Sequence, residues 1–157
     1  AQATTTFVSQ NYGAGNMARC LMATKRGLML ALGSTMGMAA LVLLLSQQLL
    51  SFFNSDVNVI ALGTGRLWYI VAPEFLQVFI DVFSGALRGY GYSLGPAILT
   101  LVGICGVRII WLYSVFAVYS TYDVLMACYS ISWLVTGAMI VGLYLRYRGK
   151  ILGANAK

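Results

Sequence analysis

Residues 27–50 read GLMLALGSTMGMAALVLLLSQQLL, an uncharged run inside a longer gap in charge between Arg26 and Asp56. A helix needs ~20 mainly apolar residues to cross the hydrocarbon core of a bilayer. Only helices and closed barrels satisfy their backbone polar groups there, and the run lacks the strict alternation of a barrel strand. The run therefore predicts a transmembrane α-helix.

The rest of the chain repeats this pattern, with no charge from Arg88 to Arg108 or from Asp123 to Arg146. Of the 157 residues, 60% are apolar and only 9% are charged, whereas soluble domains carry about 25% charged residues. We therefore predict an all-α, polytopic membrane protein that forms a single transmembrane unit over residues 1–157. The expected spans are 27–50, 67–87, 94–119 and 124–145, after a partial span at 1–12 and before a cytoplasmic tail at 146–157.

The N-terminal stretch, residues 1–12, has the apolar character of a span but only half its length, so we expect a truncated helix there. It lacks the basic start of a signal peptide. The following glycines, Gly13 and Gly15, are placed to end this helix, and Asn16 to cap the next segment. That segment, residues 17–26, is basic and is expected to lie along the inner membrane surface. No phosphate-binding motif fits these glycines.

Smaller signals mark the ends and contacts of the spans. Asp56 is a predicted cap for a short interfacial segment at 57–62, and Asp123 for the last span. Gly33 and Gly37 form a GxxxG spacing, which favours close packing between membrane helices.

Several chemistries are excluded by composition. The chain has no histidine, and its three cysteines, Cys20, Cys105 and Cys128, stand singly. This removes most zinc sites and the Ser/His/Asp and Cys/His catalytic arrangements, so we expect no enzyme and no cofactor. The cysteines are predicted to be small, buried apolar residues.

The basic residues orient the spans. If the loop after residue 12 is cytoplasmic, nearly all loop cations lie inside, which is the positive-inside rule and places the C-terminus in the cytoplasm of a plasma membrane. The net charge of +6 then predicts contact with anionic lipid and no nucleic-acid partner. The inside cations are Arg19, Lys25, Arg26, Arg88, Arg146, Arg148, Lys150 and Lys157; the outside loops hold Asp56, Arg66 and Asp123.

Three ionisable residues fall inside the predicted spans: Glu74, Asp81 and Arg108. A charge at the bilayer centre costs ~3 kcal/mol or more, so such residues usually mark a partner or a pathway. Glu74 and Asp81 lie about 20° apart on one helix face, with Gln77 on the same side. Pro73, just before Glu74, predicts a kink.

Two interpretations of these charges stay open. Glu74 and Arg108 both lie ~20 Å above the intervening turn and would be level, which allows a structural ion pair. Asp81 is left without an evident partner and is a candidate site for a proton or Na⁺, the one metal ion that we consider. Gln77 and Arg108 complete the set of candidate site residues.

Three segments resemble the MATE family, the multidrug and toxic compound extrusion transporters: TTFVSQNYGAGN, VAPEFLQVFIDVFSGALRGYGYSLGP and GICGVRIIWLY. The resemblance implies part of the C-terminal lobe of a twelve-helix transporter, from the second half of the eighth helix onward, with the missing N-terminal lobe as its partner. It further implies export of organic cations and other xenobiotics in exchange for Na⁺ or H⁺ by alternating access, in a bacterial inner membrane. Some branches of the family carry an acidic residue at the position that corresponds to Gln77 in this chain. The carboxylate of this chain, Asp81, lies one turn closer to Arg88.

Two alternatives to an antiporter remain. A lipid-linked saccharide flippase of related fold would need basic residues in its cavity, and Arg108 is the base at mid-membrane. A stand-alone small membrane protein is the other alternative, and the half-length first span argues against it.

Overall fold

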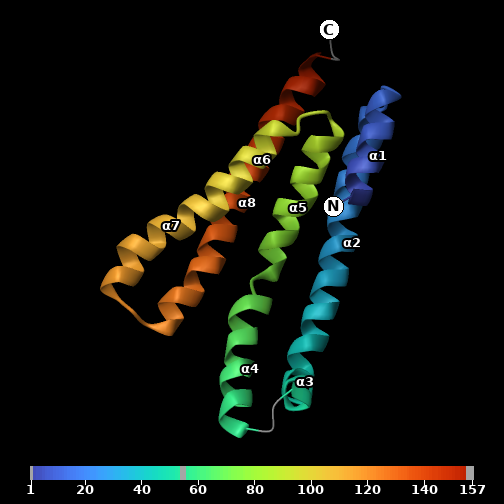
Figure 1. Cartoon of the computed structure of the whole chain (residues 1–157). Coiled ribbons are helices and arrows are strands. Elements are labelled where there is room, and N and C mark those ends of the chain that lie inside the picture. Colours follow the sequence, from blue (N-terminus) through green and yellow to red (C-terminus); the bar gives the residue numbers. More distant parts are fainter. Residues whose placement is uncertain (1, 54–55, 155–157) are drawn as a thin grey trace.

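The computed structural model describes residues 2–53 and 56–154, with side chains as far as Lys150, and within them it is helical and contains no strand (Figure 1). Four helical segments of the described chain are long and apolar enough to cross a membrane, which confirms the all-α, polytopic prediction. Their bounds are Met17–Leu44, Val57–Gly89, Leu94–Phe116 and Tyr122–Lys150.

The first turn of the chain has the predicted chemistry. Helix α1 (Gln2–Gly13) is followed two residues later by a left-handed residue, Gly15, with a φ of 71°. The Asn16 amide donates to the Asn11 carbonyl at 2.8 Å and the Gly15 amide to the Tyr12 carbonyl at 3.0 Å, which is the Schellman arrangement. The Asn16 side chain then accepts from the Arg19 amide at 3.2 Å and caps the next helix. Both predictions for this turn are confirmed.

The expectation of a separate surface helix at residues 17–26 is wrong. Helix α2 runs without interruption from Met17 to Leu44, and the short α3 (Ser46–Phe53) follows after one residue. Residues 17–26 are mostly strong helix formers, and one glycine at Gly27 costs only ~1 kcal/mol, too little to end a helix. Gly27 is instead a close contact with α1, because a Cβ there would lie 2.6 Å from the Thr4 hydroxyl.

The second of these four spans is bent, as Pro73 predicted. Helix α4 (Val57–Val71) and helix α5 (Glu74–Gly89) flank the proline, which has no N–H to donate to the preceding turn. Asp56 caps α4 by accepting from the Asn58 amide at 2.9 Å, which confirms that prediction. The expected interfacial segment at 57–62 is not separate, since it is the first part of α4.

The last two spans form a hairpin. The first contains α6 (Leu94–Leu101), a π-helical stretch η1 (Val102–Gly106), α7 (Val107–Trp111) and a second π-helical stretch η2 (Leu112–Phe116). Helix α8 (Tyr122–Ala154) returns along it. Because α8 begins at Tyr122, Asp123 lies in its first turn, where its carboxylate bonds to Tyr69 of α4. The prediction that Asp123 caps the helix is therefore wrong.

Helix α5 is the centre of the bundle. It contacts α1 and α2 on one side and α6 and α8 on the other, and Figure 1 shows it between these two groups. The Thr5 hydroxyl of α1 donates to the Gly85 carbonyl at 2.9 Å, so this hydroxyl joins two helices. Two buried clusters surround α5: Val8, Cys20, Ala86, Leu87, Tyr90 and Tyr144; and Ile80, Trp133 and Ile140.

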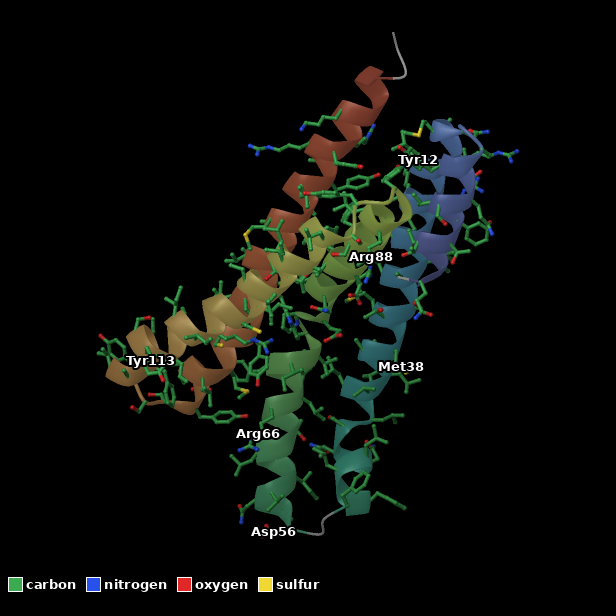
Figure 2. All side chains as sticks on the ribbon, turned by 45° about the horizontal axis from the view of Figure 1, so that its top comes forward. Tyr12, Met38, Asp56, Arg66, Arg88 and Tyr113 are labelled. Atoms are coloured by element: carbon green, nitrogen blue, oxygen red, sulfur yellow. The ribbon has the colours of Figure 1, made fainter. Side chains whose placement is uncertain are left out.

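The connections between the helices lie at two opposite ends of the bundle (Figure 1). The α1–α2 and α5–α6 turns lie at the end where α8 finishes, and the α3–α4 and α7–α8 connections lie at the other. Figure 2 places Tyr12 and Arg88 at the first end and Asp56 at the second. Between the ends, α2 presents an open face: Gly33 and Gly37 have nothing within 4 Å in the described structure, so the GxxxG pair meets no described helix.

Candidate ion-binding pocket on α5

The polar residues of α5 face a pocket of about 440 Å³ between α5 and the α6–η1 segment. Gln77, Asp81, Ser84 and Arg88 occupy successive turns of α5, at the i, i+4 and i+7 spacing that brings side chains onto one face. Pro73 fixes where this helix starts. The lining residues of polar or thiol character are Gln77, Asp81, Ser84, Arg88, Ser93, Thr100 and Cys105.

Two buried oxygens in this lining have no partner. Gln77 Oε1 and Ser84 Oγ are buried and accept or donate no hydrogen bond within the described residues. A buried polar atom left without a partner costs about 1–3 kcal/mol. Both residues line the pocket, although the two oxygens themselves are shielded from it, so a rotation of each side chain would be needed to bring them to a ligand or water there.

Asp81 supplies the pocket with a carboxylate. Its side chain is exposed to the pocket region and lies on α5 between the two unpartnered oxygens, one turn from each. No ion pair joins Asp81 to a base in the described part of the chain. One carboxylate and neutral oxygens form a hard donor set of the kind that hard cations prefer. The same carboxylate could instead take up a proton.

No cluster of three metal-binding side chains of the His, Cys, Asp or Glu types exists in residues 2–53 and 56–150. The Asp81 pocket therefore offers a single negative charge, which matches a monovalent cation better than a divalent one. Arg88, one turn beyond Ser84, brings a positive charge to the end of the same pocket. This arrangement would hold a cation near Asp81 and away from Arg88.

Glu74 does not share the Asp81 pocket. It lines a separate cavity of about 370 Å³ together with Thr35, Met38 and Ala39 of α2. Glu74 and Asp81, predicted to share one face of the helix, thus line two different pockets. Glu74 is the first residue of α5, directly after the Pro73 break, where the bent span passes α2.

Arg108 is not paired with Glu74 among the described side chains. Its Nε donates to the Ser132 hydroxyl at 3.3 Å, and its guanidinium carbon lies 4.4 Å from the centre of the Tyr129 ring. Both partners belong to α8, against which α7 packs. The prediction used depth along the helices, which does not determine which way each side chain points.

Sequence reasoning missed the α6 side of the pocket. Thr100 and Cys105 line it from the facing span, and Cys105 is exposed, whereas Cys20 and Cys128 are buried. The prediction of buried cysteines is therefore wrong for Cys105. Thr100 and Cys105 lie five residues apart, and the π-helical stretch from Val102 to Gly106 changes which residues of this span share a face. The sequence carries no evident signal for that change.

The fold and this pocket define a multi-pass helical membrane protein with a polar cavity on its central helix. Comparison with known proteins identifies the family: the MatE family model matches residues 1–114. The chain belongs to the MatE family.

Three relatives carry names that refer to multidrug resistance. The chain is 30% identical over 92 residues to the probable multidrug resistance protein NorM of Chromobacterium violaceum, covering 59% of this chain and 20% of that protein. It is 29% identical over 107 residues to the probable NorM of Thermotoga maritima, covering 68% and 23%. It is 31% identical over 105 residues to the multidrug resistance protein PmpM of Pseudomonas aeruginosa, covering 67% and 22%. The chain thus spans about a fifth of the length of these curated relatives.

Proposed function

We propose that this chain is part of a secondary antiporter that exports organic cations in exchange for Na⁺ or H⁺ by alternating access. Membership of the MatE family and the multidrug-resistance names of its relatives support export as the activity. The observation that carries the ion coupling is the Asp81 carboxylate beside two buried oxygens without partners, Gln77 Oε1 and Ser84 Oγ. Binding a cation there would satisfy the carboxylate, and rotation of the Gln77 and Ser84 side chains would bring their oxygens to the same ion.

Ion binding would drive exchange through differential affinity. A cation at Asp81 favours whichever arrangement of the bundle brings the α5 and α6 oxygens closest together, and its release favours the other. The bend at Pro73 and the π-helical stretch in the facing span are places where the two pocket walls can change shape. An N-terminal lobe, as the family resemblance implies, would complete the path for the organic cation.

The decisive experiment neutralises the carboxylate. The full-length gene product is reconstituted into liposomes, and ethidium transport driven by a Na⁺ or a pH gradient is measured. Asp81→Asn should lower gradient-driven transport at least ~10-fold, the effect of losing ~1.4 kcal/mol or more of ion binding. Asp123→Asn is the matched control outside the pocket and should retain transport. Full ion-driven transport by Asp81→Asn would refute the coupling role.

A double variant separates the two ions. Na⁺ needs the neutral oxygens as ligands, whereas a proton needs only the carboxylate. Gln77→Leu with Ser84→Ala should therefore weaken Na⁺-driven transport at least ~10-fold and leave pH-driven transport close to wild type if both ions are used. Loss of pH-driven transport in this variant would show that the oxygens serve something other than Na⁺.

The flippase alternative has less support from the pocket. The mid-membrane base on which it depended, Arg108, does not line the Asp81 pocket, and its guanidinium is held by Ser132 and Tyr129. Failure of ethidium transport under every gradient, with transport of a lipid-linked saccharide, would favour the flippase.

We also infer a plasma-membrane location with the C-terminus in the cytoplasm. What supports this is that the end of the bundle where α8 finishes also carries the cation-rich turns, including Arg19 and Arg88. A fluorescent protein fused to the C-terminus should be bright and protease-resistant in sealed cells. Protease sensitivity of the fusion in intact cells would reverse the orientation.

A further inference from the structure

A second groove, of about 690 Å³, lies between α2 and α8 and does not involve the Asp81 pocket. Phe83 of α5 contributes to it, and most of its wall is apolar. Three basic side chains also line it: Lys25 and Arg26 from α2, and Arg148 from α8. These cations come from segments more than a hundred positions apart in the sequence, so the fold brings them together.

The charges in this groove have one sign. None of its lining residues is acidic, and all three cationic side chains are exposed. No ion pair involves Lys25, Arg26 or Arg148 among the residues that the structure describes. Three neighbouring positive charges repel one another, and an anionic group between them would relieve that repulsion.

The basic residues of α2 and α8 lie near the same end of the bundle. On α2 the basic pair Lys25 and Arg26 comes before Leu28 and Met29 of the groove. The opposite direction of α8 places Arg148 beyond Tyr144 towards the same end of the bundle (Figure 1). Leu21 and Met22 also line the groove, about one turn nearer the start of α2 than Lys25 and Arg26. The groove therefore has a band of positive charge near one end of the membrane span, with apolar side chains on either side of it.

Hydroxyl groups contribute little to the open surface of the groove. Thr24 donates to the Cys20 carbonyl at 3.0 Å, and Tyr144 is hydrogen-bonded to Tyr90. What the groove offers to a ligand is thus positive charge near one end and hydrocarbon contact along the rest of its length. A small soluble anion would use only the first of these features.

We propose that the groove between α2 and α8 binds an anionic phospholipid, with its phosphate among Lys25, Arg26 and Arg148 and an acyl chain along Leu28, Met29 and Phe83. Basic pockets between transmembrane helices recognise such headgroups, and long basic side chains reach readily to the membrane interface. The site is independent of ion coupling at Asp81. It would hold α2 and α8 at a fixed separation through the lipid.

Lipid binding to the purified full-length gene product tests the proposal directly. Native mass spectrometry measures retention of phosphatidylglycerol and of phosphatidylcholine with identical acyl chains. The wild type should retain phosphatidylglycerol preferentially. The triple variant Lys25→Gln, Arg26→Gln, Arg148→Gln should lose at least ~10-fold in its apparent affinity, given that each base near a membrane surface contributes about 1 kcal/mol.

A matched triple variant controls for net charge. The variant Arg19→Gln, Arg146→Gln, Lys150→Gln removes the same total charge from α2 and α8, with one residue on α2 and two on α8, and none of these residues lines the groove. It should bind phosphatidylglycerol within twofold of the wild type. If both triple variants lost phosphatidylglycerol binding equally, general surface charge would explain the binding, and the proposed site would be overturned.

Competition distinguishes the lipid from a soluble anion. Glycerol 3-phosphate and dihexanoyl phosphatidylglycerol should displace the long-chain lipid poorly, because neither fills the apolar part of the groove. Efficient displacement by glycerol 3-phosphate would overturn the lipid assignment in favour of a soluble phosphate ligand. Undiminished lipid binding by a Phe83→Ala variant that remains folded would refute the acyl-chain position. These readouts do not require transport, so the lipid site and the antiporter function can fail separately.

Discussion

Val8 of α1 and Gly89 of α5 lie so close that a Cβ added at Gly89 would stand 2.7 Å from the Val8 Cβ and 2.9 Å from the Thr5 carbonyl oxygen. The Thr5 carbonyl oxygen belongs to the backbone, so it cannot move aside by a change of side-chain rotamer. This contact holds α1 against α5, the central helix that carries Asp81. It also gives a physical use to the last glycine of the SGALRG segment on which the family resemblance rested.

Gly89→Ala should therefore destabilise the protein by about 1–3 kcal/mol, the range for overpacking a filled interior. The measurement is the unfolding free energy, or the melting temperature, of the full-length protein in detergent. Gly142→Ala on α8 is the control, because nothing lies within 4 Å of a Cβ there in the described structure. Alanine at that position should be neutral or raise stability by up to ~1 kcal/mol through its helix propensity. Equal stability of the two variants would contradict the close contact.

Tyr90, in the turn after α5, is expected to make stability depend on alkaline pH. Burial first, and the neighbouring Tyr144 second, raise the pKa of the Tyr90 phenol well above its ordinary value. The folded state therefore prefers the neutral phenol, and this contribution is complete below the ordinary pKa of ~10. It is lost as the pH rises towards the folded-state pKa.

The wild type should consequently lose more stability between pH 8 and pH 11 than Tyr90→Phe, which cannot ionise. Chemical unfolding of both proteins at several pH values measures the difference. Tyr113→Phe is the control, since the Tyr113 side chain is 79% exposed, and it should follow the wild type. Parallel pH profiles for wild type and Tyr90→Phe would exclude the effect.

Arg108 and Tyr129 are expected to be coupled through the aromatic face. A desolvated cation–π contact contributes up to ~2 kcal/mol. Tyr129→Phe keeps the ring and should leave stability near wild type, whereas Tyr129→Leu should cost ~1–2 kcal/mol. A double-mutant cycle with Arg108→Met isolates the pair, and a coupling energy of zero would mean that the Ser132 hydrogen bond alone holds the guanidinium.

Local chemistry explains what the sequence could predict of this fold. The stop at Gly15, the Asn16 and Asp56 caps and the Pro73 bend depend on neighbouring residues alone, and all are present. The number and approximate position of the spans followed from the gaps in charge.

The failures concern how one helix is rotated against another. The proposed Glu74–Arg108 pair used depth along the helices, but side-chain direction decides pairing, and Arg108 turns to α8. Two π-helical stretches in that span shift its register, and they leave no recognisable mark in the sequence. Of the candidate site, α5 could therefore be predicted and its facing wall could not.

Cys105 tests that facing wall, because it is the one free thiol described as exposed and it lines the Asp81 pocket. Thiol modification requires access of reagent and water, so N-ethylmaleimide should label Cys105 well before the buried Cys20 and Cys128. Mass spectrometry of peptides after timed labelling measures the three rates separately.

If a cation occupies the pocket, Na⁺ should slow labelling of Cys105 relative to the same concentration of choline. Asp81→Asn should remove this protection while leaving the basal labelling rate unchanged. Faster labelling of Cys20 or Cys128 than of Cys105 would mean that the α6 wall does not face the pocket, and protection that persists in Asp81→Asn would place the cation elsewhere.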